Sequence, residues 1–324
     1  MGPSVDLAVG CFLGLALGDA LGAPFEGGLL ERGVWKLIGK TRRGEMRWTD
    51  DTQMSLDLAE VLISAGRVDP DALAAQFARS YRWSRGYGPS TARVLRRVAK
   101  GRAWRKAVHA AHPGGSFGNG AAMRAPVLGI FYASAPEGLR DEARVSASVT
   151  HAHPLGIEGA VLIAQATADI LLRRPASHVV AVALEACASD AFSKKLERAR
   201  SWLEAAATPS PGDVRRALGS GTTAPDSAVT ALYLGLRFQH EPFQDLLDFV
   251  RQCGGDTDTI GAMSGALWGA ANGAEALPDE YLSRLEARPY IEEVARSLWT
   301  TSRYRQEFRT SKAAGFSADE ETDA

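Results

Sequence analysis

Two short segments of this sequence place carboxylates and hydroxyls side by side. The first is Thr-Asp-Asp-Thr at 49–52, within WTDDTQMSLDLAE, and the second is Asp-Thr-Asp-Thr at 256–259, within GGDTDTIGAMSGALWGAANG. An apolar helical pattern follows each one. A helix start uses one capping side chain, and acidic residues in its first turn suit the helix dipole. Capping therefore explains only one or two of the four polar residues in each segment.

The remaining oxygens point to a metal site, since an unpaired buried carboxylate is costly. If the two helix starts face one another, they form a site made only of oxygen ligands. Such a site prefers the hard cations Mg²⁺, Mn²⁺ or Ca²⁺ over zinc. Two divalent ions would neutralise four carboxylates in one pocket. The alternative is that the two segments are independent helix caps.

Three further segments could contact a ligand. GGSFGNGAAMRAP at 114–126 is a glycine-rich loop that opens a helix, so it is either an anion site or a plain turn. His151 and His153 precede a buried helix without a nearby cysteine, which makes them core residues or ligand contacts rather than a zinc motif. Glu26 leaves a buried helix and enters a glycine-rich stretch; a single loop glutamate is more often solvated.

The elements that must position these residues read as helices. The stretch 26–47 holds five glycines without a sustained period, and we expect a loop or mobile flap there. A helix covering 7–23 and the two helical patterns 156–172 and 260–271 are apolar nearly all round, which is typical of the middle of a large bundle. Apolar residues recur at helical spacing in 52–64, 71–83, 91–99, 120–132, 156–172, 178–188, 227–238, 243–250, 260–271 and 290–299.

Composition limits the possible classes of protein. The 324 residues are 45% apolar, and 37 basic residues balance 38 acidic ones. A net charge of −1 argues against a general nucleic-acid or membrane-surface binder. The apolar run between Asp6 and Asp19 is too short to cross a bilayer, and no basic segment precedes it. We expect no membrane partner and no direct nucleic-acid binding.

The cysteines and the C-terminal tail complete this picture. Cys11, Cys187 and Cys253 are far apart, so neither a disulfide framework nor a zinc site is indicated, and a cytoplasmic location is expected. No shift in composition divides the chain. We expect a single domain over 1–309 and a disordered acidic tail over 310–324.

Five motifs occur together and in a particular order: GCFLGLALGDALGAPFE, WTDDTQMSL, SFGNGAAMRAP, THAHPLGIEGA and GGDTDTIGAMSGALWGA. The set resembles the ADP-ribosylglycohydrolase family over about residues 5–300. The N-terminal segment is especially similar to the bacterial branch that acts on dinitrogenase reductase. The resemblance implies an all-α, compact, orthogonally packed multi-helix bundle. It also implies a centre of two Mg²⁺ ions at the bottom of a cleft, where Mn²⁺ is possible as well.

The resemblance also implies roles for particular residues. Backbone N–H groups of Ser116, Gly118 and Asn119 would hold the diphosphate of ADP-ribose. Phe117 would stack near the adenine, and His151 would lie at the adenosine end of the cleft. The metal ligands carried over by motif are Thr49, Asp50, Asp51, Asp256, Asp258 and Thr259.

The implied reaction is hydrolysis of the bond between ribose C1″ and a modified protein side chain, with an ADP-ribosylated protein as substrate and ADP-ribose as product. Glu26, Asp50 or Asp258 would handle the proton. The segment RGYGPST at 85–91 lacks the aspartate that the dinitrogenase-reductase branch carries there. This departure favours O-linked (serine-type) or broad substrates, with N-linked arginine close behind. The alternatives are an inactive ADP-ribose-binding or crystallin-like structural protein, and a metal-dependent phosphohydrolase.

Overall fold

The computed structural model describes residues 4–205 and 208–319, and this part of the chain contains helices and no β-sheet. The all-α prediction is therefore confirmed. The helices of the first half are α1 (Val5–Gly22), α2 (Leu29–Ile38), α3 (Asp50–Ala65), α4 (Pro70–Ser80), α5 (Pro89–Ala99), α6 (Trp104–Ala111), α7 (Pro126–Tyr132) and α8 (Leu139–Ser148). The later helices are α9 (Pro154–Leu171), α10 (Ala176–Ala186), α11 (Asp190–Glu204), α12 (Pro211–Ala217), α13 (Ala224–Arg237), α14 (Phe243–Cys253), α15 (Thr257–Asn272), α16 (Asp279–Leu282) and α17 (Arg288–Asp319). Short 3₁₀ turns are η1 (Ala23–Phe25), η2 (Trp83–Arg85) and η3 (Asn119–Ala121).

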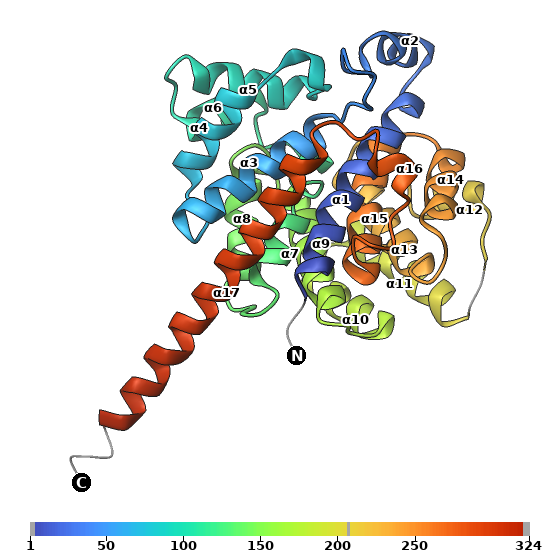
Figure 1. The fold of residues 1–324 in the computed structure, drawn as a ribbon. Coiled ribbons are helices and arrows are strands. Elements are labelled where there is room, and N and C mark those ends of the chain that lie inside the picture. Colours follow the sequence, from blue (N-terminus) through green and yellow to red (C-terminus); the bar gives the residue numbers. More distant parts are fainter. Residues whose placement is uncertain (1–3, 206–207, 320–324) are drawn as a thin grey trace.

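Helices α1 and α15 pack against each other at backbone contact near the centre of the bundle (Figure 1). A Cβ built at Gly14 would lie 2.2 Å from the carbonyl oxygen of Gly265, and one at Gly18 would lie 2.0 Å from that of Gly261. Only glycine permits so close an approach. The pairing is antiparallel, so the end of α1 reaches the start of α15. This arrangement brings the residues after α1 beside the second aspartate segment.

Two helical segments, Val5–Phe25 and Pro154–Leu171, are long and apolar enough to cross a membrane by length and composition. In the fold, 89% and 72% of their apolar windows are buried inside the protein. Burial against other helices accounts for their apolar character, as expected for core helices.

The prediction of a loop over 26–47 is wrong in part, because α2 occupies its middle. Leu30, Val34 and Leu37 follow one another at spacings of four and three residues, which suits a helix face. Glycines on both sides of this short pattern concealed it. The predicted helix over 120–132 is also divided: η3 comes first, and α7 begins at Pro126, a residue favoured at the first helical position.

The last helix reaches into the predicted C-terminal tail. Helix α17 continues through Asp319 and extends away from the bundle (Figure 1). Residues 310–319 continue this helix, and the good helix formers Lys312, Ala313 and Ala314 agree with that state; the disordered tail over 310–324 stays a prediction. Residues 320–324 of the predicted tail lie outside the described part of the chain.

Candidate functional site

A cleft of about 350 Å³ brings together the segments that the sequence singled out. A larger hollow of about 760 Å³ lies elsewhere, beside Trp202; three arginines and no carboxylate line it, so it does not match the predicted chemistry. Among the predicted site residues, Thr49 and Phe117 do not line the cleft. Those that do are Glu26, Asp50, Asp51, Ser116, Gly118, Asn119, His151, Asp256, Asp258 and Thr259.

Helix α3 begins at Asp50 because two other residues satisfy its first N–H groups. The Thr49 side chain accepts from the Asp51 N–H at 3.3 Å. Asp19, which is fully buried in α1, accepts from the Thr49 N–H at 2.9 Å and from the Thr52 N–H and hydroxyl at 3.1 and 2.6 Å. The side chains of Asp50 and Asp51 are therefore not needed as N-caps of their own helix. Asp19 was absent from the predicted site, although an acid inside an apolar helix was a visible signal.

The second half of the site is set by a glycine turn before α15. Gly255 has φ +82°, and a Cβ there would lie 2.0 Å from the Ser220 carbonyl oxygen. The next N–H, that of Asp256, donates to this same oxygen at 2.9 Å. The Asp256 side chain makes no capping bond to α15; instead it accepts from Asn119 Nδ2 at 2.5 Å. The turn thus directs the first carboxylate of α15 towards the glycine-rich loop.

The two halves meet. The Thr259 hydroxyl lies 3.5 Å from Asp51 Oδ1, and Glu26, Asp256 and Asp258 each offer an oxygen within 4.8 Å of the others. Asp51 Oδ2 is buried and has no hydrogen-bond partner within the described structure. A converging set of oxygens that includes an unsatisfied carboxylate suits a hard divalent cation. This buried acidic cluster could therefore bind a metal.

Burial and mutual repulsion shift the pKa values of these acids upward. Burial raises the pKa of Asp50 and of Asp51 well above the usual range, and the charge of Asp19 raises both further. Burial also raises the pKa of Asp258 well above its usual range, and the charges of Glu26 and Asp256 raise it further. Asp19 itself reaches a pKa of about 6, because burial outweighs its four hydrogen bonds. A bound cation would favour the ionised carboxylates and relieve this repulsion.

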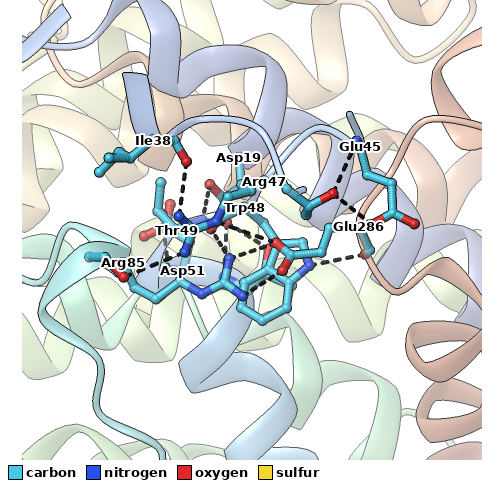
Figure 2. Close-up of polar contacts among 12 residues, drawn as sticks. Asp19, Ile38, Glu45, Arg47, Trp48, Thr49, Asp51, Arg85 and Glu286 are labelled. Carbon is cyan, nitrogen blue, oxygen red and sulfur yellow. Dashed lines mark hydrogen bonds and ion pairs between the residues drawn. The ribbon is translucent and has the colours of Figure 1, made fainter. Parts of the chain in front are cut away.

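A clamp from distant parts of the chain holds the residue before Thr49 (Figure 2). Arg85 donates to the Glu286 carboxylate at 2.7 and 2.9 Å, and its guanidinium lies 3.5 Å from the ring centroid of Trp48. It also donates to the Trp48 carbonyl at 2.7 Å, while the Trp48 indole N–H donates to the Glu286 carbonyl at 3.1 Å. A planar guanidinium suits both the bidentate pair and the ring contact. The clamp therefore fixes the backbone that leads into the first aspartate segment.

The glycine-rich loop lies on the cleft, and two of the N–H groups predicted to hold a diphosphate bond within the protein in this structure, so their role in diphosphate binding stays a prediction. The Gly118 N–H donates to Ser116 Oγ at 3.2 Å, and the Asn119 N–H donates to the Thr222 carbonyl at 3.0 Å. These two groups are therefore already used within the protein and are not free for a diphosphate in this conformation. The cause is long-range pairing of this loop with the segment before α13, which sequence spacing does not reveal.

His151 presents a defined face to the cleft. Its Nδ1 lies 2.8 Å from the Thr150 hydroxyl, which in turn accepts from Arg124 Nη2 at 3.0 Å. Nδ1 is therefore bonded within the protein, and Nε2 is the ring nitrogen beside the glycine-rich loop, 3.3 Å from a Cβ built at Gly118. Burial lowers the pKa of His151 to about 3, with further lowering by the charge of Arg124 and by His112. His151 is therefore a neutral ring whose Nε2 lies beside the glycine-rich loop.

Phe117 lies at the edge of this region. Its side chain is 40% exposed, and its ring centroid lies 5.3 Å from that of His153. Stacking of Phe117 near an adenine stays a prediction.

The fold and this acidic cleft define an all-helical protein in which the aspartates of the cleft come from two helix starts far apart in sequence. The chain belongs to the ADP-ribosylglycohydrolase family, whose model matches residues 3–307. It is 31% identical to ADP-ribosylhydrolase ARH3 of Gallus gallus, covering 89% of this chain and 91% of that protein. It is 30% identical to ADP-ribosyl-[dinitrogen reductase] glycohydrolase of Rhodospirillum rubrum, covering 89% and 93%. A solved structure described as an ADP-ribosylglycohydrolase-related protein complex matches with a TM-score of 0.68 and 30% identity, covering 92% of this chain and 98% of that one.

Proposed function

We propose that this chain is a Mg²⁺-dependent hydrolase that removes ADP-ribose from modified protein side chains. One observation carries the proposal: the two aspartate segments converge with Glu26 in one cleft, and Asp51 Oδ2 is buried there without a partner. Family membership supports the substrate class.

The proposed metal ligands come from both helix starts. Asp50 and Asp51 would act from the start of α3, and Asp256, Asp258 and Thr259 from the start of α15. Thr49 precedes Asp50 in the chain and does not line the cleft. When bound, two Mg²⁺ ions, or Mn²⁺, would supply positive charge that orients the ribose hydroxyls and acidifies a nearby water. Asp19 and the Arg85–Glu286 clamp hold the first half of this set in position.

The protein's own part in the reaction is placement and proton transfer. Water adds its oxygen to ribose C1″, the bond from C1″ to the side chain breaks, and the leaving atom takes up a proton. An oxocarbenium-like state at C1″ would be stabilised by nearby carboxylates. Glu26 is the proposed proton carrier, because it lines the cleft within reach of the acidic cluster and is less buried than Asp256 and Asp258. Asp50 and Asp258 are the alternatives.

The residues of the cleft near Asp50 guide our proposal for the side chain to which ADP-ribose is linked. Gly86, Tyr87, Gly88, Pro89 and Ser90 line the cleft there, and none of them is an acid. An arginine guanidinium leaving group would gain from a carboxylate at one of these positions. We therefore propose O-linked, serine-type substrates first and N-linked arginine second.

The test is release of ADP-ribose from two peptides, one modified on serine and one on arginine, with Mg²⁺ or with EDTA. We expect release with Mg²⁺, faster from the serine peptide, and loss of release with EDTA. Binding of ADP-ribose without release from either peptide would replace the proposal with an ADP-ribose-binding role.

A further inference from the structure

Apolar side chains are exposed on two segments that adjoin the cleft. Seven large apolar side chains are exposed within the described structure. Four of them lie on two segments: Phe25, Val34 and Leu37 on residues 25–37, and Trp83 on residues 83–86. Leu37 is 85% exposed and Trp83 is 75% exposed. Apolar side chains gathered on neighbouring segments, rather than scattered singly, mark a surface for a partner.

Both segments adjoin residues that line the cleft beside the acidic cluster. Glu26 lies near the start of the first segment and lines the cleft. On the second, a Cβ built at Gly86 would lie only 3.7 Å from Asp50 Oδ1, and Trp83 stands three residues earlier. Both segments therefore border the part of the cleft where ribose C1″ would be cleaved.

Arg47 joins the two segments. It donates from Nη1 to the Ile38 carbonyl at the end of α2, at 2.9 Å, and from Nη2 to the Ser84 hydroxyl in η2, at 3.5 Å (Figure 2). Helices α2 and α5 also stand at the same end of the bundle (Figure 1). The end of α2, the helix that carries Val34 and Leu37, is thus tied through Arg47 to the turn that carries Trp83, and we refer to these residues together as the rim.

The charge of this rim is positive. Lys40, Arg42 and Arg43 follow α2 and are exposed, and they form no ion pair with any side chain that the structure describes. Arg82, next to Trp83, is exposed and donates to backbone carbonyls rather than to an acid. The chain as a whole carries a net charge of −1, so this local excess is not a general property of the surface.

We propose that this rim, formed by Val34, Leu37 and Trp83 with Lys40, Arg42 and Arg43, binds the polypeptide on which the ADP-ribose is carried. The inference rests on the proposed function and adds the kind of partner: a segment with apolar and acidic residues beside the modified side chain. The protein attached at C1″ must leave the cleft past Glu26 and Gly86, and the rim is the surface that it meets. Apolar contacts supply the affinity, and the basic side chains favour acidic neighbours.

The experiment compares two substrates of one linkage: a modified peptide with acidic and leucine neighbours, and the corresponding ADP-ribosylated free amino acid. Leu37→Ser with Trp83→Ala should raise KM for the peptide at least about fivefold and leave kcat nearly unchanged. The same variant should turn over the free amino-acid conjugate as the wild type does. On a further peptide with basic in place of acidic neighbours, the wild type should show a higher KM, and Arg42→Glu with Arg43→Glu should remove this difference between the two peptides. Tyr304→Ser, at a side chain that is 69% exposed on α17, is the matched control and should change neither substrate.

The outcomes separate this inference from the proposed function. Turnover of both substrates by the wild type, with equal kcat/KM for peptide and amino-acid conjugate, would overturn the inference and leave the hydrolase standing. A variant that loses both substrates equally would also overturn it, because the effect would not lie with the polypeptide. If the wild type releases ADP-ribose from neither substrate, the proposed function fails and the inference fails with it.

Discussion

At the scale of single residues, the site depends on buried polar groups whose partners lie far away in sequence. Asp19 binds the start of α3 thirty residues later, and Asn119 binds Asp256 across 137 residues. Residue type and spacing predicted ten of the residues that line the cleft. They did not predict Asp19 or Arg124, because no local pattern shows which distant N–H or hydroxyl a buried side chain will meet. The same limit applies to the N–H groups of Gly118 and Asn119, because no local pattern shows the bonds that they make within the protein.

The neutral state of His151 predicts a pH dependence of stability. The pKa in the folded protein is about 3, below the ordinary value of 6.5, so the unfolded chain takes up the proton first as the pH falls. The contribution to stability is complete above about pH 6.5 and is lost progressively below it, by at most about 1.4 kcal/mol per pH unit. Urea unfolding at pH 7, 6 and 5 should show this loss in wild type relative to His151→Gln, which keeps a donor but cannot titrate.

The comparison with His151→Gln is needed because the buried aspartates also make stability depend on pH. Their raised pKa values favour the folded state as the pH falls, and they do so equally in wild type and variant. If the wild type and His151→Gln lose stability in parallel, His151 is not held neutral by its surroundings. The same variant should bind ADP-ribose better than His151→Ala if Nε2 is the atom that contacts the ligand.

At the scale of elements, the pairing of α1 with α15 decides where the two aspartate segments meet. The sequence predicted both helices from their apolar, glycine-rich pattern. It did not predict α2, whose short pattern is enclosed by glycines, nor the division of 120–132 at Pro126. The register between α1 and α15 was also beyond prediction, since it depends on which glycines face one another in space.

Gly18→Ala tests this pairing. A methyl group there would lie 2.0 Å from the Gly261 carbonyl oxygen, so the two helices must move apart. We expect a loss of at least about 3 kcal/mol in the free energy of unfolding, or failure to fold. Gly33→Ala is the matched control: no atom lies within 4 Å of its added Cβ, and alanine should stabilise α2 by up to about 1 kcal/mol. Equal stability of Gly18→Ala and wild type in thermal unfolding would show that the close contact is not needed.

At the scale of the whole molecule, one bundle holds three separate parts of the chain around the cleft. Residues 46–51 are held by Asp19 from α1, by Arg85 from η2 and by Glu286 just before α17. The flap segment with Glu26 and the turn before α15 close the other side. The acidic cluster is therefore a property of the complete fold, and the single-domain boundary at residue 309 stays a prediction. The central claim is that the two aspartate segments act together as one binding site for divalent cations.

Calorimetric titration of Mg²⁺ in the presence of ADP-ribose tests that claim most directly, with wild type, Asp51→Asn and Asp258→Asn. We predict binding of two ions by wild type. We also predict that either substitution weakens the binding of both ions at least about tenfold, or about 1.4 kcal/mol, since both helix starts supply ligands to a shared centre. Thermal unfolding without Mg²⁺ should show that both variants remain folded, because neither substitution removes a core contact. Absence of Mg²⁺ binding by wild type, or binding by Asp258→Asn as tight as that of wild type, would contradict the account.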